Sequence, residues 1–235
     1  VMVEKKKLGG VCLNEGCVPS KTLLQAAKTY HHAKHGSIFG VEAGSLSFDF
    51  GKAHAHKNSV MDRMRDGIAG LMKKHKVEVI EGEATLVKGG FSVNGETHEA
   101  ENILLCTGSS PTIPPIPGIE AEHIVDSTGI LNNETLPENL VIVGGGVIGC
   151  EFACVYASVG VPVTVLEAMP EICPNLDSEI SAILRKELEK KGVTFVLGAK
   201  VESFEGKSVR YNLEGEGKDM DADLVLIATG RRPNV

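Results

Sequence analysis

Two cysteines near the start of the chain are the residues best suited to chemistry. Cys12 and Cys17 have four residues between them, and Pro19 and Lys21 follow closely. An unbroken α-helix would separate their Cα atoms by roughly 7.5 Å of rise and about 140° of rotation, whereas a disulfide needs them within about 7 Å. Because Gly16 permits the backbone angles of an unwound turn, the sequence predicts a redox-active disulfide at a distorted helix start.

The surroundings of these thiols leave more than one interpretation open. Backbone N–H groups at a helix start lower the pKa of a thiol, which favours redox chemistry. A structural bridge or two unpaired thiols also fit, because this spacing is less diagnostic than C-x-x-C. The other cysteines lie in apolar or strand-like settings and are expected to be buried free thiols: Cys106, Cys150, Cys154 and Cys173.

Composition restricts the classes of ligand. The 235 residues are 42% apolar, which allows one or two domains, and two are preferred. A net charge of −7, without a basic block and with 4% aromatic residues, argues against a nucleic-acid partner. No apolar segment is long enough for a membrane span, and the sparse cysteines fit a reducing compartment. We therefore expect small-molecule ligands and a cytoplasmic location, or the mitochondrial matrix if the source is eukaryotic.

A glycine-rich motif in the second half predicts a nucleotide site. The apolar run Leu140–Val143 leads into Gly144, Gly146 and Gly149, and a helix is expected from Glu151 onward. In a G-x-G-x-x-G turn the first glycine makes the tight turn, the second lets a pyrophosphate approach the helix N-terminus, and the third allows close packing. The motif therefore predicts a dinucleotide site, with Val147 and Ile148 inside the turn.

An acidic residue completes this nucleotide-binding unit. The strand expected over 161–166 ends at Glu167, 18 residues after the last glycine of the motif. A carboxylate there accepts hydrogen bonds from the adenosine ribose and repels a 2′-phosphate. Glu167 therefore favours NAD over NADP. By the same rule Glu4, at the end of an N-terminal strand, is a ribose ligand or a solvated acid.

Periodicity predicts the remaining elements. Helices are expected over 21–35, 50–76 and 178–191, the last with Ile180, Ile183, Leu184 and Leu188 facing inward. Short strands are expected over 77–81, 84–87, 91–93, 193–197, 200–205, 208–213 and 223–228, and a buried strand over 102–109. His31 and His35 have the i,i+4 spacing of metal ligands, but no third ligand accompanies them, so solvated helix faces are favoured and no metal is expected.

Two strands end in a similar way. The strand before Gly108 and the strand before Gly230 both run into Thr-Gly, which indicates two similar nucleotide-binding domains in tandem. The proline-rich connection over 111–117 is stiff and marks the boundary between them. We therefore expect one domain over 1–116 and a second over 117–235.

Taken together, these motifs resemble the FAD-dependent pyridine nucleotide–disulfide oxidoreductases. The resemblance covers nearly the whole chain and rests on four segments in order: 9–21, Thr107-Gly108-Ser109, 144–151 and 228–234. It implies an α/β fold of two tandem Rossmann-like nucleotide-binding domains, an FAD type truncated at its N-terminus and an NAD type, each with a small antiparallel β excursion.

The resemblance also implies residue roles. Cys12 corresponds to the interchange thiol that meets substrate and Cys17 to the thiol packed against the flavin. Lys21 corresponds to the lysine near flavin N5, and Glu151 to the glutamate that pairs with it. The implied cofactor-binding residues are Glu4, Gly10, Lys21, Thr107, Gly108, Ser109, Gly144, Gly146, Val147, Ile148, Gly149, Glu167 and Gly230.

The implied reaction is the oxidation of dihydrolipoamide, with electrons passing through the cysteine pair and FAD to NAD. The implied partner is a lipoyl domain of a 2-oxoacid dehydrogenase or glycine cleavage complex, and the full-length protein is expected to be a homodimer. The first FAD glycine turn and the C-terminal interface segment of the family are absent from these residues, so the chain alone is expected to be inactive. Two alternatives are a related disulfide or mercuric reductase, usually NADPH-dependent, and a nucleotide-binding module without catalysis.

Overall fold

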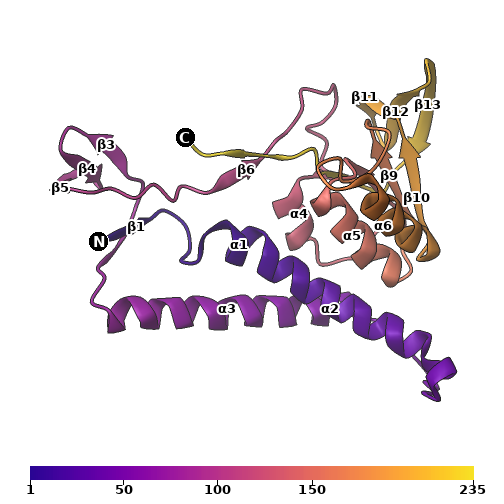
Figure 1. Ribbon diagram of the computed structural model, residues 1–235, viewed down its shortest axis with the longest axis horizontal. Coiled ribbons are helices and arrows are strands. Elements are labelled where there is room, and N and C mark those ends of the chain that lie inside the picture. The colour runs from indigo at the N-terminus through magenta and orange to yellow at the C-terminus, as the bar shows by residue number, and fades with distance from the viewer.

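The computed structural model describes residues 1–235 and has a mixed α/β fold. Figure 1 shows an elongated molecule, with a small antiparallel sheet (β3–β5) at one end and a second one (β11–β13) at the other. Between them lie the N-terminal helices and a larger parallel sheet with its own helices. None of the helices combines the length and the apolar character needed to cross a bilayer.

The N-terminal half consists mainly of helices. Its elements are β1 (Met2–Glu4), α1 (Gly10–Glu15), α2 (Cys17–Lys34), a 3-10 helix (Gly36–Phe39), α3 (Phe50–Lys74) and β2 (Val79–Glu81). The two strands pair in parallel. The second helix begins at Cys17, before the predicted start, because Pro19 lies in the first turn, where a helix needs no N–H from that residue. α3 matches its prediction and begins after Asp49, whose side chain accepts from the N–H of Lys52 at 2.9 Å.

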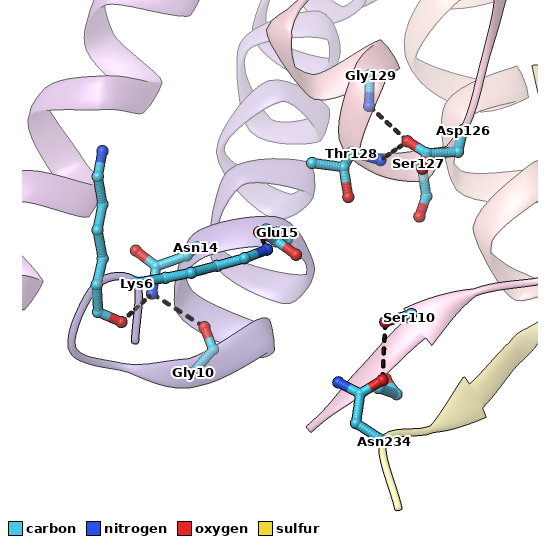
Figure 2. A network of polar contacts seen from close by, with 12 residues as sticks. Lys6, Gly10, Asn14, Glu15, Ser110, Asp126, Ser127, Thr128, Gly129 and Asn234 are labelled. Carbon is cyan, nitrogen blue, oxygen red and sulfur yellow. Dashed lines mark hydrogen bonds and ion pairs between the residues drawn. The ribbon is translucent and has the colours of Figure 1, made fainter. Parts of the chain in front are cut away.

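The C-terminal half is built on a parallel sheet with the order β10-β9-β8-β14-β7. Its elements are β7 (Ile124–Val125), α4 (Ser127–Asn132), β8 (Leu140–Val143), α5 (Val147–Ser158), β9 (Val163–Glu167), α6 (Ser178–Lys190), β10 (Val193–Leu197) and β14 (Leu224–Ile227). Asp126 caps α4 by accepting from two backbone N–H groups at 2.8 Å, as Figure 2 shows. The strand–turn–helix–strand unit predicted around the glycine motif is confirmed.

Both predicted antiparallel excursions are present. The first contains β3 (Thr85–Val87), β4 (Gly90–Val93) and β5 (Glu96–Glu99), and the second contains β11 (Lys200–Glu205), β12 (Ser208–Leu213) and β13 (Glu216–Asp221). Asn94 and Gly95 both have positive φ, at 53° and 85°, as a two-residue hairpin turn requires. β13 was not expected, because its sequence is almost entirely polar and an exposed edge strand needs no apolar face.

One apolar core connects the two halves. Leu23 on α2 and Phe50 on α3 belong to the same buried cluster as Phe152 and Tyr156 on α5. The rings of Phe50 and Tyr156 lie 5.6 Å apart. The helices of the N-terminal half are therefore held against the parallel sheet by shared burial, and the boundary between 116 and 117 stays a prediction.

Two short strands form a second connection between the halves. β6 (Ser109–Pro111) pairs antiparallel with β15 (Arg231–Pro233), although 120 residues separate Pro111 from Arg231 in the chain. Figure 1 shows this ribbon crossing the middle of the molecule above α1. Each of its two strands directly follows one of the two similar Thr-Gly sequences.

Some expectations about burial are wrong. The segment 102–108 forms no strand, and Leu104 is 87% exposed, because no other strand lies beside it to provide hydrogen-bond partners. Cys106 is exposed for the same reason. On α6, Leu188 is buried as expected, but Ile180 and Ile183 are more than half exposed because no element covers that face.

Candidate active site

A glycine break separates the helix that carries Cys12 from the helix that Cys17 begins. Gly9 precedes the first helix with a φ of 108°, in the left-handed region that glycine adopts most easily. A Cβ on Gly16 would lie 3.1 Å from the carbonyl oxygen of Val11. A side chain there would crowd α1, so the predicted interruption between the two cysteines is confirmed.

Asn14 fixes the loop in front of the cysteines. Its Nδ2 donates to the carbonyl oxygens of Lys7, Leu8 and Gly10 at 3.0–3.2 Å, and Figure 2 shows it turned into that loop. Its Oδ1 accepts from Nη1 of Arg65 on α3 at 3.0 Å. Gly10, one of the implied cofactor ligands, has a φ of 64° at this bend. The loop that leads to Cys12 is thus bound to the long helix behind it.

Both cysteines of the predicted redox pair are exposed free thiols. The neighbouring Cys17 thiol, and then burial, raise the pKa of Cys12, while the positive charge of Lys21 acts in the opposite direction. For Cys12 the expected lowering of the pKa is therefore wrong. The helix that carries Cys12, α1, is only six residues long, so its N–H groups provide little field. The structure has the dithiol form, and the disulfide form stays a prediction.

Lys21 and Glu151 form an ion pair across the two halves. Nζ of Lys21 lies 2.6 Å from Oε1 of Glu151, and the lysine side chain is 56% exposed and the glutamate side chain 24%. Buried Ser20 lies 3.2 Å from the carbonyl oxygen of Cys17 and 3.4 Å from Oε2 of Glu151. The predicted contact is present and ties α2 to α5, while the roles of these residues in catalysis stay predictions.

The glycine turn has the shape that a dinucleotide site needs. A Cβ on Gly144 would lie 2.5 Å from the carbonyl oxygen of Ala228, and one on Gly149 would lie 2.1 Å from that of Gly144. These two glycines are therefore required by packing. A Cβ on Gly146 would meet nothing within 4 Å, so this position faces open space where a pyrophosphate can approach.

Free backbone donors point out of the same turn. The N–H groups of Val147, Ile148 and Gly149 donate to no group of the chain, whereas the next N–H, that of Cys150, donates to Gly146 O at 2.9 Å. Val147 is exposed, and Ile148 packs against the core. The start of the 12-residue α5 therefore offers unpaired N–H groups and the positive end of a helix dipole to an anion.

Glu167 lies directly beside this turn, at the end of β9. Its side chain is buried, with Oε2 accepting from Gly145 N at 2.5 Å and Oε1 from Met169 N at 2.7 Å. Each carboxylate oxygen keeps a further lone pair for a ribose hydroxyl. The acid is placed as predicted, and it also holds the glycine turn, which the sequence did not indicate.

The first Thr-Gly turn lies against the cysteine helix. A Cβ on Gly108 would lie 2.9 Å from Cγ2 of Val11, the residue before Cys12, and Gly108 has a φ of 74°. Asn234 holds this turn through its N–H to Gly108 O at 3.0 Å and its Nδ2 to Thr107 O at 2.9 Å. Its Oδ1 accepts from Ser110 Oγ at 2.7 Å, as Figure 2 shows.

The second Thr-Gly turn repeats these contacts with the strands exchanged. Gly230 O accepts from Thr112 N at 2.9 Å, and Oγ1 of Thr229 donates to Thr112 O at 3.0 Å. Arg231 then reaches across to Ser109, with Nε donating to Oγ at 2.9 Å and Nη2 to the carbonyl oxygen at 2.6 Å. The predicted residues Ser109 and Gly230 thus lie together in one ribbon.

The remaining candidates lie away from this centre. Glu4 ends β1, where its Oε1 accepts from the Lys6 N–H at 2.9 Å beside an open pocket of about 250 Å³. The rings of His31, in the last turn of α2, and His35, directly after this helix, lie 4.5 Å apart. Nowhere does the chain gather three or more His, Cys, Asp or Glu side chains in a metal-binding group.

Comparison with protein families decides where this arrangement belongs. The family model described as pyridine nucleotide-disulphide oxidoreductase matches residues 1–235. The chain belongs to this family. Two named relatives within it are dihydrolipoyl dehydrogenases. The one from Geobacillus stearothermophilus is 42% identical, over 99% of this chain and 51% of the relative. The one from Acholeplasma laidlawii is 38% identical, over 99% of this chain and 71% of the relative.

Solved structures agree with this assignment. The Cu(II) complex of the HOCl-induced flavoprotein disulfide reductase RclA from Escherichia coli superposes with a TM-score of 0.82 at 34% identity, covering 98% of this chain and 50% of that one. LpdA from Mycobacterium tuberculosis superposes with a TM-score of 0.86 at 25% identity. The match covers 99% of this chain and 52% of LpdA. The chain thus spans about half the length of these structures and of the Geobacillus relative.

Sequence reasoning missed several residues that hold the candidate site together. Asn14, Ser20 and Asn234 were part of the motifs but had no assigned contact. A short polar residue among glycines or prolines is the only sign of such a role, because its side chain can bond nearby backbone groups. Arg231 lacked even that sign, since its partner Ser109 lies 122 residues away.

The arrangement brings thiol chemistry and anion binding to one pair of helices. Cys17 and Lys21 are four residues apart, so they share one exposed face of α2. α2 is joined by Lys21 and Ser20 to α5, whose first turn carries the unpaired N–H groups. The cysteine pair, a cation and the glycine turn are therefore connected through contacts between α2 and α5.

Proposed function

We propose that the full-length protein oxidises dihydrolipoamide to lipoamide and passes the electrons to NAD. The support is the exposed Cys12/Cys17 pair together with curated relatives that are dihydrolipoyl dehydrogenases at 38% to 42% identity. Because the chain spans about half of the Geobacillus relative, the activity belongs to the longer protein.

The ion pair between Lys21 and Glu151 is the observation that carries this proposal. It connects the thiol helix α2 to the nucleotide helix α5 at 2.6 Å, across 130 residues of sequence. Neither residue is needed to bury apolar surface, because both side chains reach solvent. The pair therefore fixes the thiol helix relative to the nucleotide helix and keeps a cation near the thiols, which is the positioning that the proposed reaction needs.

The thiol step needs only the two cysteines and the substrate. One substrate thiolate attacks Sγ of Cys12 in the Cys12–Cys17 disulfide, forming a mixed disulfide and releasing Cys17 as a thiolate. The second substrate thiolate attacks the substrate sulfur of that mixed disulfide and releases Cys12. The lipoyl S–S bond forms as the protein S–S bond breaks, and two electrons now reside on the cysteines. Cys12 leaves as a thiolate, and its raised pKa favours uptake of one of the two protons that the substrate thiols gave up.

The residues present fit the two cofactors. Open space at Gly146 and the free N–H groups of α5 fit the pyrophosphate of NAD, with Glu167 beside the ribose position and Gly144, Val147, Ile148 and Gly149 shaping the turn. Exposed Cys17 and Lys21 on one face of α2 fit a flavin ring, and the Thr107-Gly108-Ser109 turn packs through Gly108 against Val11 on α1. We assign Glu4 and Gly10 to the same cofactor. When bound, FAD would relay the two electrons from the reduced cysteines to NAD. We assign Gly230, whose carbonyl oxygen accepts from Thr112 N at 2.9 Å, to the same set of cofactor-binding residues.

The finer architecture is part of the same proposal. We assign residues 1–116 to an FAD-type domain and 117–235 to an NAD-type domain, which makes two Rossmann-like units in tandem. The partner would be a lipoyl domain of a 2-oxoacid dehydrogenase or glycine cleavage complex, and the full-length enzyme a homodimer in the cytoplasm or mitochondrial matrix. The repeated Thr-Gly turns on the two strands of one ribbon support a tandem origin.

A second candidate is a disulfide reductase acting on another substrate. It is favoured by the likeness to the flavoprotein disulfide reductase RclA at 34% identity. The discriminating residue is Glu167, because its charge repels the 2′-phosphate of NADP. A non-catalytic nucleotide-binding module is the third reading, and it gives no role to exposed Cys12 and Cys17.

Steady-state kinetics of the purified full-length protein test the proposal. We expect NAD reduction with dihydrolipoamide, flavin absorbance in the purified protein, and a lower kcat/KM with NADP. NADPH-dependent reduction of a different disulfide, without dihydrolipoamide oxidation, would replace the leading function by the second candidate. Protein that contains no flavin and reduces no disulfide would leave only the binding module.

A further inference from the structure

A second pair of cysteines lies beneath the glycine turn. Cys150 is in the first turn of α5 and Cys173 is in the loop after β9, and their sulfur atoms are 4.0 Å apart. Both residues are buried, at 5% and 4% exposure. Neither belongs to the chemistry proposed above, and 23 residues separate them in the sequence.

Both thiols contact the same backbone group of the turn. Sγ of Cys150 lies 3.3 Å from the carbonyl oxygen of Gly145, and Sγ of Cys173 lies 3.7 Å from it. The N–H of Cys173 donates to this oxygen at 3.0 Å. The N–H of Gly145, in the preceding peptide unit, donates to Glu167. The cysteine pair thus contacts the carbonyl group of Gly145, while Glu167 binds its N–H.

The turn has little room to accommodate a movement of this pair. A Cβ on Gly145 would lie 3.0 Å from Cγ2 of Ile172, the residue before Cys173. Cys173 itself has a φ of 46°, a left-handed angle that few residues other than glycine adopt. A displacement of Cys173 is therefore transmitted directly to Gly145 and to the start of α5.

We propose that Cys150 and Cys173 are a second dithiol–disulfide site, whose oxidation lowers the affinity of the glycine turn for the pyridine nucleotide. The oxidant is a hydroperoxide: two thiols and H2O2 give one S–S bond and two molecules of water, with two electrons passing from sulfur to the peroxide oxygens. The nucleotide effect rests on the function proposed above, whereas formation of the bond does not.

The geometry explains why the bond would change nucleotide binding. The sulfur atoms must approach from 4.0 Å to about 2.05 Å, and both S–H donors at Gly145 O are lost. Either Cys173 or the first turn of α5 has to shift, and both contact Gly145. The contact from Gly145 to Glu167 and the unpaired N–H groups at the start of α5 would then lose the alignment that the nucleotide needs.

Burial separates this pair from the exposed one. Burial is the leading cause that raises the pKa of Cys150, and it also raises the pKa of Cys173. The pair therefore stays protonated and reduced while Cys12 and Cys17 exchange, since the thiolate is the reactive form. Oxidation needs sustained peroxide and an opening of the loop over 168–177, so we expect it to be slow.

The experiment uses the full-length protein with Cys12→Ser and Cys17→Ser, which removes the exposed pair. This protein is incubated with hydrogen peroxide, digested and analysed by mass spectrometry, and its NADH affinity is measured by fluorescence before oxidation, after oxidation and after dithiothreitol. We expect a peptide pair joined through Cys150 and Cys173, two hydrogens lighter than its parts. We also expect the Kd for NADH to rise about tenfold, within the usual range of coupling between sites, and to recover on reduction.

Additional variants give the controls. Cys173→Ala, or Cys150→Ala if the first fails to fold, should abolish the joined peptide and the peroxide effect on NADH affinity. Cys154→Ser changes a half-buried cysteine of the same helix and should leave both intact. Oxidation of the exposed Cys106, measured in the same digest, shows that the oxidant has reacted with the protein.

Two outcomes would overturn the proposal. One is oxidised Cys106 without any joined Cys150–Cys173 peptide, and the other is the joined peptide with an unchanged Kd. Weak NADH binding before oxidation would instead count against the proposed nucleotide site. In that case the joined peptide would still show whether the Cys150–Cys173 bond forms. Failure of this proposal and failure of the proposed function are therefore distinguishable.

Discussion

The two cysteine pairs of this chain have the same side chains in opposite surroundings. Cys12 and Cys17 are exposed on either side of a helix break, whereas Cys150 and Cys173 are buried under the glycine turn. A chain that must exchange disulfides with a substrate needs the first environment, and a chain that must keep thiols reduced needs the second. The difference teaches that exposure and neighbouring charge decide what a cysteine pair can do.

Neighbouring charges strengthen this difference. Lys21 acts to lower the pKa of Cys12, although the thiol of Cys17 outweighs it. Around Cys150 the neighbouring charges are negative, from Glu167 and Glu151, and they add to burial in raising its pKa. Glu151 therefore serves both pairs, because it binds the cation beside the exposed thiols and repels a thiolate at the buried ones.

The largest effect is expected at the exposed pair. Cys17→Ser in the full-length protein should lower dihydrolipoamide oxidation by on the order of 10³-fold or more, because no disulfide can form. NADH-dependent reduction of a dye should persist, since it bypasses the cysteines. Steady-state assays with both substrates check this, with Cys106→Ser as the control at another exposed cysteine. Equal loss of both activities would mean that the exposed pair is structural.

The sequence revealed the exposed pair for a physical reason. Local chain geometry alone shows that four residues between two cysteines need a helix break, and Gly16 provides it. The glycine turn and Glu167 were likewise visible, because strand, turn, helix and acid follow one another within a short segment. The contact between Lys21 and Glu151 is different, since only the family resemblance connected two residues 130 positions apart.

The rest depends on contacts that have no local sequence pattern. Nothing in the sequence places Cys150 beside Cys173, because a helix residue and a loop residue share no periodicity. The pairing of β6 with β15 involves three-residue strands on either side of the C-terminal sheet. The buried strand predicted over 102–109 was wrong for a related reason. Apolar residues indicate a tendency to be buried, but they do not show whether a neighbouring strand is present to pair with.

A buried histidine extends the contrast between buried and exposed groups to pH. Burial, and then the charge of Lys57, lowers the pKa of His54 to about 4, and its Nε2 has no partner. Between about pH 6.5 and 4 the unfolded chain binds a proton that the folded chain refuses, so stability falls as the pH falls through this window. The loss is at most about 3 kcal/mol.

Urea unfolding at pH 7 and pH 4.5 measures this loss. His54→Gln should flatten the difference between the two pH values relative to the unchanged protein. The matched control is His56→Gln, on the same helix but exposed, and it should leave the difference as it was. If His56→Gln reduced the difference between the two pH values as much as His54→Gln does, burial would not be the cause.

A smaller effect is expected at the ion pair between the two halves. Lys21→Met should lower kcat/KM for dihydrolipoamide about tenfold, because the thiol pair loses its nearby cation and α2 its tie to α5. The control is Lys6→Met, which removes a pair of the same kind: Lys6 and Glu15 lie 2.7 Å apart, with side chains 67% and 22% exposed. Steady-state kinetics of both variants give the comparison. If the two variants slowed the reaction equally, position would be irrelevant and only net charge would matter.

The smallest effect concerns stability, where the order of the two pairs reverses. Cys150→Ala removes a sulfur atom from a closed space and should cost about 1 kcal/mol of unfolding free energy. Cys12→Ala removes an exposed sulfur and should change stability by less than about 0.5 kcal/mol, although it abolishes the proposed reaction. Urea midpoints of the two variants test this, with circular dichroism to confirm equal folding at the start. Equal losses would mean that the exposed pair also supports the fold. The predicted reversal would show that the exposed pair serves the proposed exchange without supporting the fold, whereas the buried pair contributes to packing as well.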